Sequence, residues 1–139
     1  MLKWPITYTD YNGNTRTENF YFNITKAELM EMNFGAFGAY SELIERIAET
    51  EDIRAIANEF KTLILKAYGE KSLDGKTFIK KDPSRGRLAD EFEQTEAYSE
   101  LYMELLNDPD KASQFIVGIL PQDLQVEAKK NAESFKLAD

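Results

Sequence analysis

The sequence contains no cysteine and no histidine among its 139 residues. Without cysteine there is no disulfide bond, no thiolate nucleophile and no thiolate metal site. Without histidine, the usual general base near neutral pH and the commonest transition-metal ligand are both missing. Ser-His-Asp and Cys-His catalytic arrangements are therefore excluded.

Basic residues and long apolar runs are also scarce. Asp and Glu number 25 against 17 Lys and Arg, and the net charge is −8. Nucleic acids and anionic membranes are bound through clustered Lys and Arg, so we expect neither as a partner. No run approaches the ~18 apolar residues of a membrane span, and residues 1–5 lack the apolar segment of a signal peptide. We expect a cytoplasmic protein that needs no metal or other cofactor and binds other proteins.

The composition is that of a folded chain, because 42% of the residues are apolar and 30% are charged. We predict an α+β fold that is predominantly α-helical, with an N-terminal β-hairpin packed on a bundle of about five helices. Residues 1–120 are expected to form a single globular domain. Residues 121–139 space their apolar residues poorly for a helix and are expected to form a tail, as a frayed helix or disordered.

The N-terminal residues alternate between the two faces of a strand. Trp4, Ile6 and Tyr8 share one face, and Phe20 and Phe22 continue this alternation after Asn12-Gly13, a typical tight-turn pair. Residues 3–24 are therefore predicted to form one β-hairpin. Thr25 and Glu28 then form a capping box that begins a short helix over 26–33.

Helical spacing of apolar residues predicts four further helices, at 39–50, 52–68, 86–107 and 110–120. Gly69 is expected to stop the second of these. A small second hairpin is predicted near residues 70–81, around the turn pair Asp74-Gly75. Pro83 or Ser84 is expected near the start of the 86–107 helix.

Three charged groups are the candidates for chemistry. An acidic cluster (Asp90, Glu91, Glu93 and Glu96) could hold a carboxylate dyad, but a solvated helix face is favoured because buried acids are rare. Asp74-Gly75-Lys76 and Asp108-Pro109-Asp110 could contribute metal ligands, but turn formation explains both. The basic stretch (Lys76, Lys80, Lys81, Arg85 and Arg87) could contact phosphate, although a solvated, charge-balancing loop is favoured.

Two aromatic residues lie between glycines, Phe34 and Phe37 in the segment Phe34-Gly35-Ala36-Phe37-Gly38. They could anchor a partner or a second copy of the chain from a flexible connector. The favoured alternative is that both fold under the loop into the core, because large apolar residues are usually buried.

Several blocks together resemble the tail assembly chaperones of long-tailed phages and prophages of Gram-positive bacteria. They are residues 22–29 (FNITKAEL), 60–72 (FKTLILKAYGEKS), Asp74-Gly75, 78–80 and 92–105 (FEQTEAYSELYMEL), following the N-terminal hairpin. The resemblance covers about residues 4–120. It implies a protein without catalytic activity that binds the tape-measure protein, keeps it soluble and helps recruit tail-tube protein subunits. It also implies a homo-oligomer that works in the host cytoplasm and is absent from the mature virion.

The 110–120 helix is the predicted partner-binding or self-association element. Its apolar face carries Phe115, Ile116, Ile119 and Leu120, and Pro109 and Pro121 bracket it like hinges. Our hypothesis is that this helix leaves the core and offers that face to a partner or a sister subunit.

Three other functions stay open at this point. The chain could be a small acidic phage protein that inhibits a host factor, although its acids are interspersed with Lys and Arg. It could be a structural tail completion protein. An enzyme acting through the 90–96 acids is the third.

Overall fold

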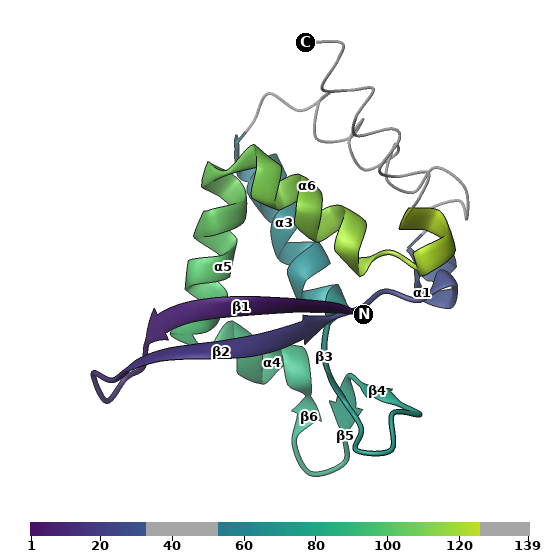
Figure 1. The fold of residues 1–139 in the computed structure, drawn as a ribbon, viewed down its shortest axis with the longest axis horizontal. Helices are drawn as coiled ribbons and strands as arrows, with labels where there is room; N and C mark the ends of the chain where they lie inside the picture. The colour runs from purple at the N-terminus through teal and green to yellow at the C-terminus, as the bar shows by residue number, and fades with distance from the viewer. Residues whose placement is uncertain (33–52, 126–139) are drawn as a thin grey trace.

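The computed structural model describes residues 1–32 and 53–125. Their elements, shown in Figure 1, are β1 (Leu2–Thr9), β2 (Thr15–Phe22), α1 (Lys26–Glu31), α3 (Ile53–Ala67), β3 (Tyr68–Lys71), β4 (Phe78–Ile79), β5 (Lys81–Asp82), β6 (Gly86–Arg87), α4 (Leu88–Glu93), α5 (Glu96–Asn107) and α6 (Pro109–Ile119). The predicted α+β class is confirmed, with helix in about half of the described residues. The helix predicted at 39–50 lies outside them.

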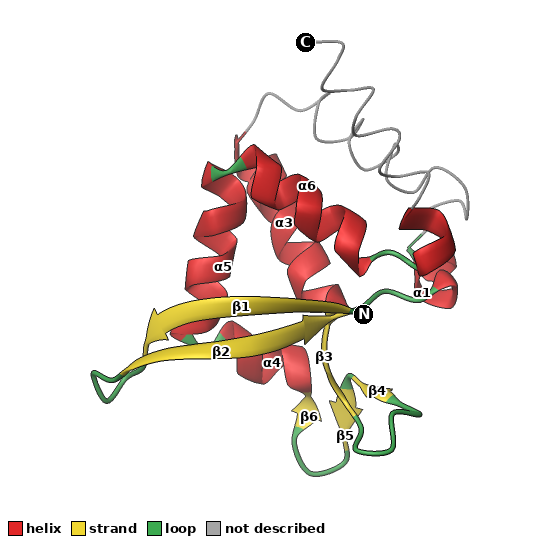
Figure 2. Cartoon of the chain, in the orientation of Figure 1, coloured by secondary structure: helices red, strands yellow, loops and turns green. Residues whose placement is uncertain are grey.

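The N-terminal hairpin forms as the alternation predicts. β1 and β2 pair antiparallel along their whole length, from Leu2 opposite Phe22 to Thr9 opposite Thr15. Gly13 takes a φ of 82° in the turn, and the Asp10 carboxylate accepts the N–H groups of two turn residues. The helices of the core cover one face of this hairpin, as Figure 2 shows.

The second predicted hairpin is also confirmed, and it belongs to the same sheet. The strand order is β1-β2-β3-β4, with Tyr21 of β2 opposite Gly69 of β3. α3 ends at Ala67, and Gly69 lies inside β3 instead of capping the helix. A Cβ at Gly69 would lie 2.5 Å from Cε2 of Phe78, so the glycine allows β3 and β4 to approach.

The expectation that a helix starts at Pro83 or Ser84 is wrong. Residues 81–87 form a second, two-stranded sheet in which Lys81 of β5 lies opposite Arg87 of β6. The Asp82 carboxylate accepts the backbone N–H of Ser84, and Gly86 takes a φ of 75°. These local bonds complete a turn, so α4 begins only at Leu88.

The prediction of a single helix over 86–107 is also wrong, because the helix is interrupted at Thr95. Thr95 has an extended backbone (φ −97°, ψ 155°) and its hydroxyl accepts the N–H of Tyr98, which makes it the N-cap of α5. The same hydroxyl donates to the carbonyl of Phe92 at the end of α4. A threonine that satisfies both helix ends favours two short helices over one long one.

An aromatic cluster forms the centre of the core between the sheet and the helices. The rings of Tyr68 and Phe92 stack at 4.2 Å between centroids, and Phe22 packs edge-on against both Phe92 and Phe115. No polar or charged side chain is buried in the described ranges 1–32 and 53–125. The core of the fold therefore relies on apolar and aromatic packing.

The core continues past residue 120, where the tail was predicted to begin. Leu124 is only 7% exposed within it, and the Gln125 side chain donates to the carbonyl of Leu120. The rest of the predicted tail, residues 126–139, lies outside the described residues. None of the helices described is long and apolar enough to cross a membrane.

Candidate partner-binding surfaces

The acidic cluster at 90–96 does not converge on one point. Glu91 pairs with Arg85 at 2.9 Å, Glu93 pairs with Lys61 at 3.1 Å, and Glu96 accepts the hydroxyl of Tyr11 at 3.1 Å. These contacts point to three different elements, so the carboxylates do not form a dyad that could share a proton. Within residues 1–32 and 53–125, no three acidic side chains are grouped so that they could hold a metal ion.

The two Asp-containing turns are explained by backbone bonding. Asp74 accepts the N–H of Lys76 and the hydroxyl of Ser72 in the β3–β4 turn, and these bonds lower the pKa of its carboxyl. Asp108 is the N-cap of α6 and accepts the N–H groups of Asp110 and Lys111. Both acids therefore stabilise local turns.

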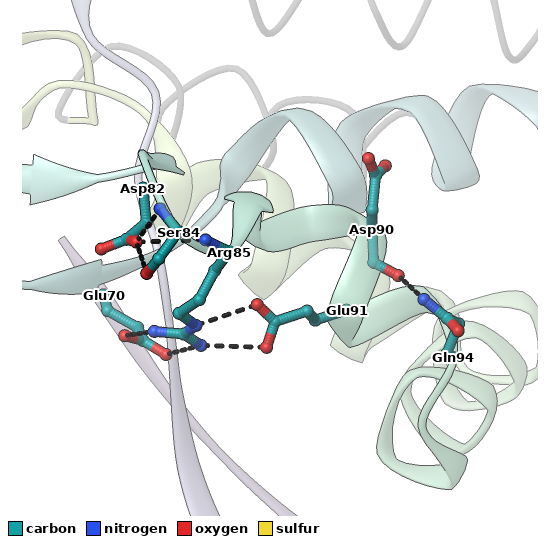
Figure 3. A network of polar contacts seen from close by, with 7 residues as sticks. All are labelled: Glu70, Asp82, Ser84, Arg85, Asp90, Glu91 and Gln94. Atoms are coloured by element: carbon teal, nitrogen blue, oxygen red, sulfur yellow. Dashed lines mark hydrogen bonds and ion pairs between the residues drawn. The ribbon is translucent and has the colours of Figure 1, made fainter.

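Within the basic stretch, Arg85 joins three elements. Its guanidinium donates to both oxygens of Glu70 on β3, at 3.0 and 3.1 Å, and to both oxygens of Glu91 on α4, at 2.9 and 3.2 Å (Figure 3). The two carboxylates raise the pKa of Arg85 above its already high usual value. This doubly bidentate arrangement fits a structural role for Arg85 in the β5–β6 turn.

Lys80 is structural as well, although the sequence suggests a solvated loop. Its ammonium donates to the carbonyls of Asn23 (2.8 Å) and Lys66 (2.7 Å) and to a carboxylate oxygen of Glu28 (2.5 Å). Burial lowers the pKa of Lys80, and the ion pair with Glu28 opposes this. In the sequence, Lys80 directly follows the apolar pair Phe78-Ile79, and this is the local feature that could have indicated partial burial of its side chain.

Lys76, Lys81 and Arg87 are the members of the basic stretch that form no ion pair within the described residues, and Lys81 and Arg87 are the two that face each other. They lie directly opposite each other on β5 and β6 and are exposed. Neither forms an ion pair within the described part of the chain. Together with Lys66 and Lys80 they line a cleft of about 440 Å³. We call this pair of strands, with Lys81 and Arg87, the basic hairpin.

The predicted binding face of α6 lies in the core. Phe115 is fully buried, with its ring 5.6 Å from that of Trp4 and 5.1 Å from that of Phe22. Ile116, Ile119 and Leu120 are at most 5% exposed. The other predicted residues, Phe34 and Phe37, lie outside the described ranges.

α6 is also fixed by its backbone. The carbonyl of Ile119 accepts the N–H of Ile24, and Gly118 lies so close to Leu2 that a Cβ there would be 2.7 Å from Cδ1. Exposing four large apolar side chains costs roughly 1.5–3 kcal/mol each. The total is comparable with the whole stability of a domain, which is about 5–15 kcal/mol. This face can therefore bind a partner only if the partner replaces the core contacts.

A groove along the outer edge of the sheet is accessible without any rearrangement. It has a volume of about 550 Å³ and lies between β1 and α5, lined by Pro5, Ile6, Thr7, Glu100, Leu101, Met103, Glu104, Asn107 and Asp108. Three of these residues are acids, and no lysine or arginine lines it. Met103 is 48% exposed. We call this groove, with the nine residues that line it, the acidic groove.

Comparison with known families shows to which class of protein this chain belongs. The model of a family described as phage tail assembly chaperone matches residues 1–138. The chain belongs to the phage tail assembly chaperone family. Neither the comparison with curated proteins nor that with solved structures gives a match.

Membership of a tail assembly chaperone family assigns the protein a non-enzymatic role among phage tail proteins. The resemblance noted in the sequence is thereby confirmed at the level of the family. The surfaces that matter are those that can contact another chain.

Proposed function

We propose that this protein binds the tape-measure protein, keeps its long helices soluble before the tube encloses them, and helps recruit tail-tube subunits. The family match over residues 1–138 is the observation that supports this most strongly. We place this activity in the cytoplasm of a Gram-positive host carrying the phage or prophage. We also propose that the protein self-associates and is absent from the mature virion.

The first experiment is co-expression with the tape-measure protein encoded by the same phage. We expect the tape-measure protein to move from the pellet to the soluble fraction and to co-purify with this chain. The proposal fails if the tape-measure protein is equally insoluble with and without it. Recovery of the chain from purified virions would instead support a structural tail completion protein. Capture of a DNA-binding host factor would support an inhibitor.

We further propose that the α6 face (Phe115, Ile116, Ile119 and Leu120) contacts the tape-measure protein after α6 swings out of the core. Pro109 stands at the first position of α6 and Pro121 follows its last turn, so the helix is bounded at both ends. The face is large and apolar, as a partner with apolar helical stripes requires. The tape-measure protein would then replace the contacts of α6 with Trp4 and Phe22.

A reversible disulfide tests this opening, because the chain has no cysteine of its own. Leu2→Cys with Gly118→Cys would link β1 to α6, since a Cβ at Gly118 would lie 3.2 Å from Cγ of Leu2. We expect the oxidised variant to lose tape-measure binding and the reduced variant to recover it. Equal binding by the two forms would refute the opening of α6 but leave tape-measure binding itself intact. Leu2→Cys alone and the reduced form of the double variant are the controls, because a Cβ at Gly118 would clash with an intact Leu2 side chain.

A further inference from the structure

The basic hairpin holds two like charges in an unfavourable arrangement. Lys81 and Arg87 are directly opposite on neighbouring strands, and like charges at such positions destabilise a strand pair. Among the nearby carboxylates, Asp82 bonds the backbone of its own turn, and Glu70 and Glu91 both pair with Arg85. Glu28 and Glu31 line the same cleft, but Glu28 pairs with Lys80, and neither acid forms an ion pair with Lys81 or Arg87 within the described residues. An external anionic group would relieve the repulsion.

The acidic groove has the complementary arrangement. Glu100 and Glu104 lie one turn apart on α5, and Asp108 follows at its C-cap, so all three acids line the groove. Glu104 accepts the indole N–H of Trp4 and Asp108 caps α6, but neither contact carries a positive charge. Within the described residues, none of the three acids forms an ion pair.

The groove also follows a strand edge that can accept a neighbour. β1 is the first strand of the sheet order, so one side of it has no strand partner within residues 1–32 and 53–125. Met103 adds an exposed apolar side chain beside this edge. A short β-hairpin with two cations therefore matches the groove in charge.

We propose that the basic hairpin of one copy of this chain docks in the acidic groove of a second copy. Charge complementarity identifies the occupant, because Lys81 and Arg87 supply the cations that the groove lacks. The contact gives a definite interface to the self-association in the proposed function and needs no tape-measure protein.

The placement of the two surfaces makes the contact head-to-tail. β1 and β4 are the opposite edges of the main sheet, and β5 and β6 lie beside β4, well away from the upper half of α5 (Figure 1). The contact joins different surfaces of the two copies, so a copy that contacts one neighbour through its hairpin still has a groove that can receive another hairpin.

The test is a charge exchange measured by sedimentation of the purified full-length chain. The hairpin variant is Lys81→Glu with Arg87→Glu. The groove variant is Glu100→Lys with Asn107→Lys, two exposed residues of α5 whose side chains form no hydrogen bond within the described residues. We expect each variant alone to associate about tenfold more weakly or worse, because close charge pairs contribute at least this much across an interface. Mixing the two variants should restore assembly, because the groove of the first still fits the hairpin of the second.

The matched control is Asn58→Lys with Glu59→Lys on α3, which changes the net charge as the groove variant does but outside both surfaces. It should associate like the wild type. Raising the salt from about 0.05 M to about 0.5 M should weaken wild-type assembly, because exposed charges are screened.

Three outcomes overturn the proposal. They are a wild-type chain that stays monomeric up to about 0.5 mM, association that neither variant weakens, and a mixture of the two variants that does not reassemble. Tape-measure binding is measured separately by co-purification, so the failure of one proposal is distinguishable from the failure of the other.

Discussion

Replacing Lys80 by methionine should destabilise the fold far more than the same change at Lys81. The Lys80 ammonium uses all three of its donors, on Glu28 and on the carbonyls of Asn23 and Lys66. It thereby ties the end of β2 and the start of α1 to the end of α3. Methionine keeps the length and apolar stem of the side chain but leaves these three acceptors without their donor.

The magnitude follows from the burial of the pair. Removing one partner of a fully buried ion pair costs about 3–5 kcal/mol. The Lys80 and Glu28 side chains are 25% and 20% exposed, so part of that loss is recovered by solvent. We expect Lys80→Met to cost about 2–3 kcal/mol, which is roughly 10 °C in Tm for a chain of this size. Lys81→Met should change stability by less than about 0.5 kcal/mol, as surface substitutions usually do.

The pH dependence gives a second measurement of the same pair. Burial raises the pKa of Glu28, but hydrogen bonds from Lys80 and from the Thr25 backbone outweigh it, so the folded pKa lies below the ordinary 4.5. A lowered folded pKa contributes stability above the unfolded pKa, and this contribution is lost as the pH falls through the folded value. The difference between wild type and Lys80→Met should therefore be largest near neutral pH and shrink below about pH 4.5.

Urea unfolding followed by circular dichroism, from pH 7 down to pH 3, measures both effects. The reasoning is refuted if Lys80→Met and Lys81→Met lose the same stability at neutral pH. It is equally refuted if the Lys80→Met difference grows as the pH falls.

Substitutions at three further positions test the packing and the helix break by the same urea assay. Gly69→Ala should cost about 1–3 kcal/mol because its Cβ would meet Phe78 and the backbone oxygen of Ile79; a neutral result would show that β3 and β4 separate easily. Thr95→Ala should cost about 1 kcal/mol through loss of the α5 N-cap, and Thr95→Ser should recover most of it. Phe115→Ala should cost about 3–5 kcal/mol because the ring is fully buried, and a loss below about 1 kcal/mol would mean that α6 contributes little to the core.

The strands and their turns were largely predictable from the sequence because their signals are local. Period-two alternation around Asn12-Gly13 is sufficient to specify the first hairpin, and Asp74-Gly75 specifies the second. The joining of the two hairpins into one sheet was not predicted. The pairing of Tyr21 with Gly69 is a tertiary contact that no local pattern contains.

The wrong predictions between residues 82 and 96 have the opposite cause. Here the local hydrogen bonding of single residues determined the structure, against the apolar periodicity of a long segment. The apolar spacing through Leu88, Phe92 and Leu101 predicts one continuous helix. Thr95 caps a new helix instead, and Asp82 and Gly86 close a turn before the first. Periodicity summed over a long segment does not detect a single residue that bonds its own backbone.

The site was predictable only in part for a related reason. The apolar face of α6 was identified correctly as a face, but periodicity alone cannot distinguish a core-facing side from one that faces a partner. The basic stretch was treated as one unit, whereas the fold separates it. Lys80 is partly buried and bonded to backbone carbonyls, Arg85 joins two carboxylates, and Lys81 with Arg87 stays exposed.

The contact of Trp4 with Phe115 has a consequence for the order of synthesis. The first strand is synthesised before the helices that cover it, and its aromatic partner lies on the last described helix of the core. The apolar face of the N-terminal hairpin is therefore incompletely covered until α6 has been synthesised, and the native core can close only then. A member of a chaperone family thus passes through a stage in which its own apolar face is exposed.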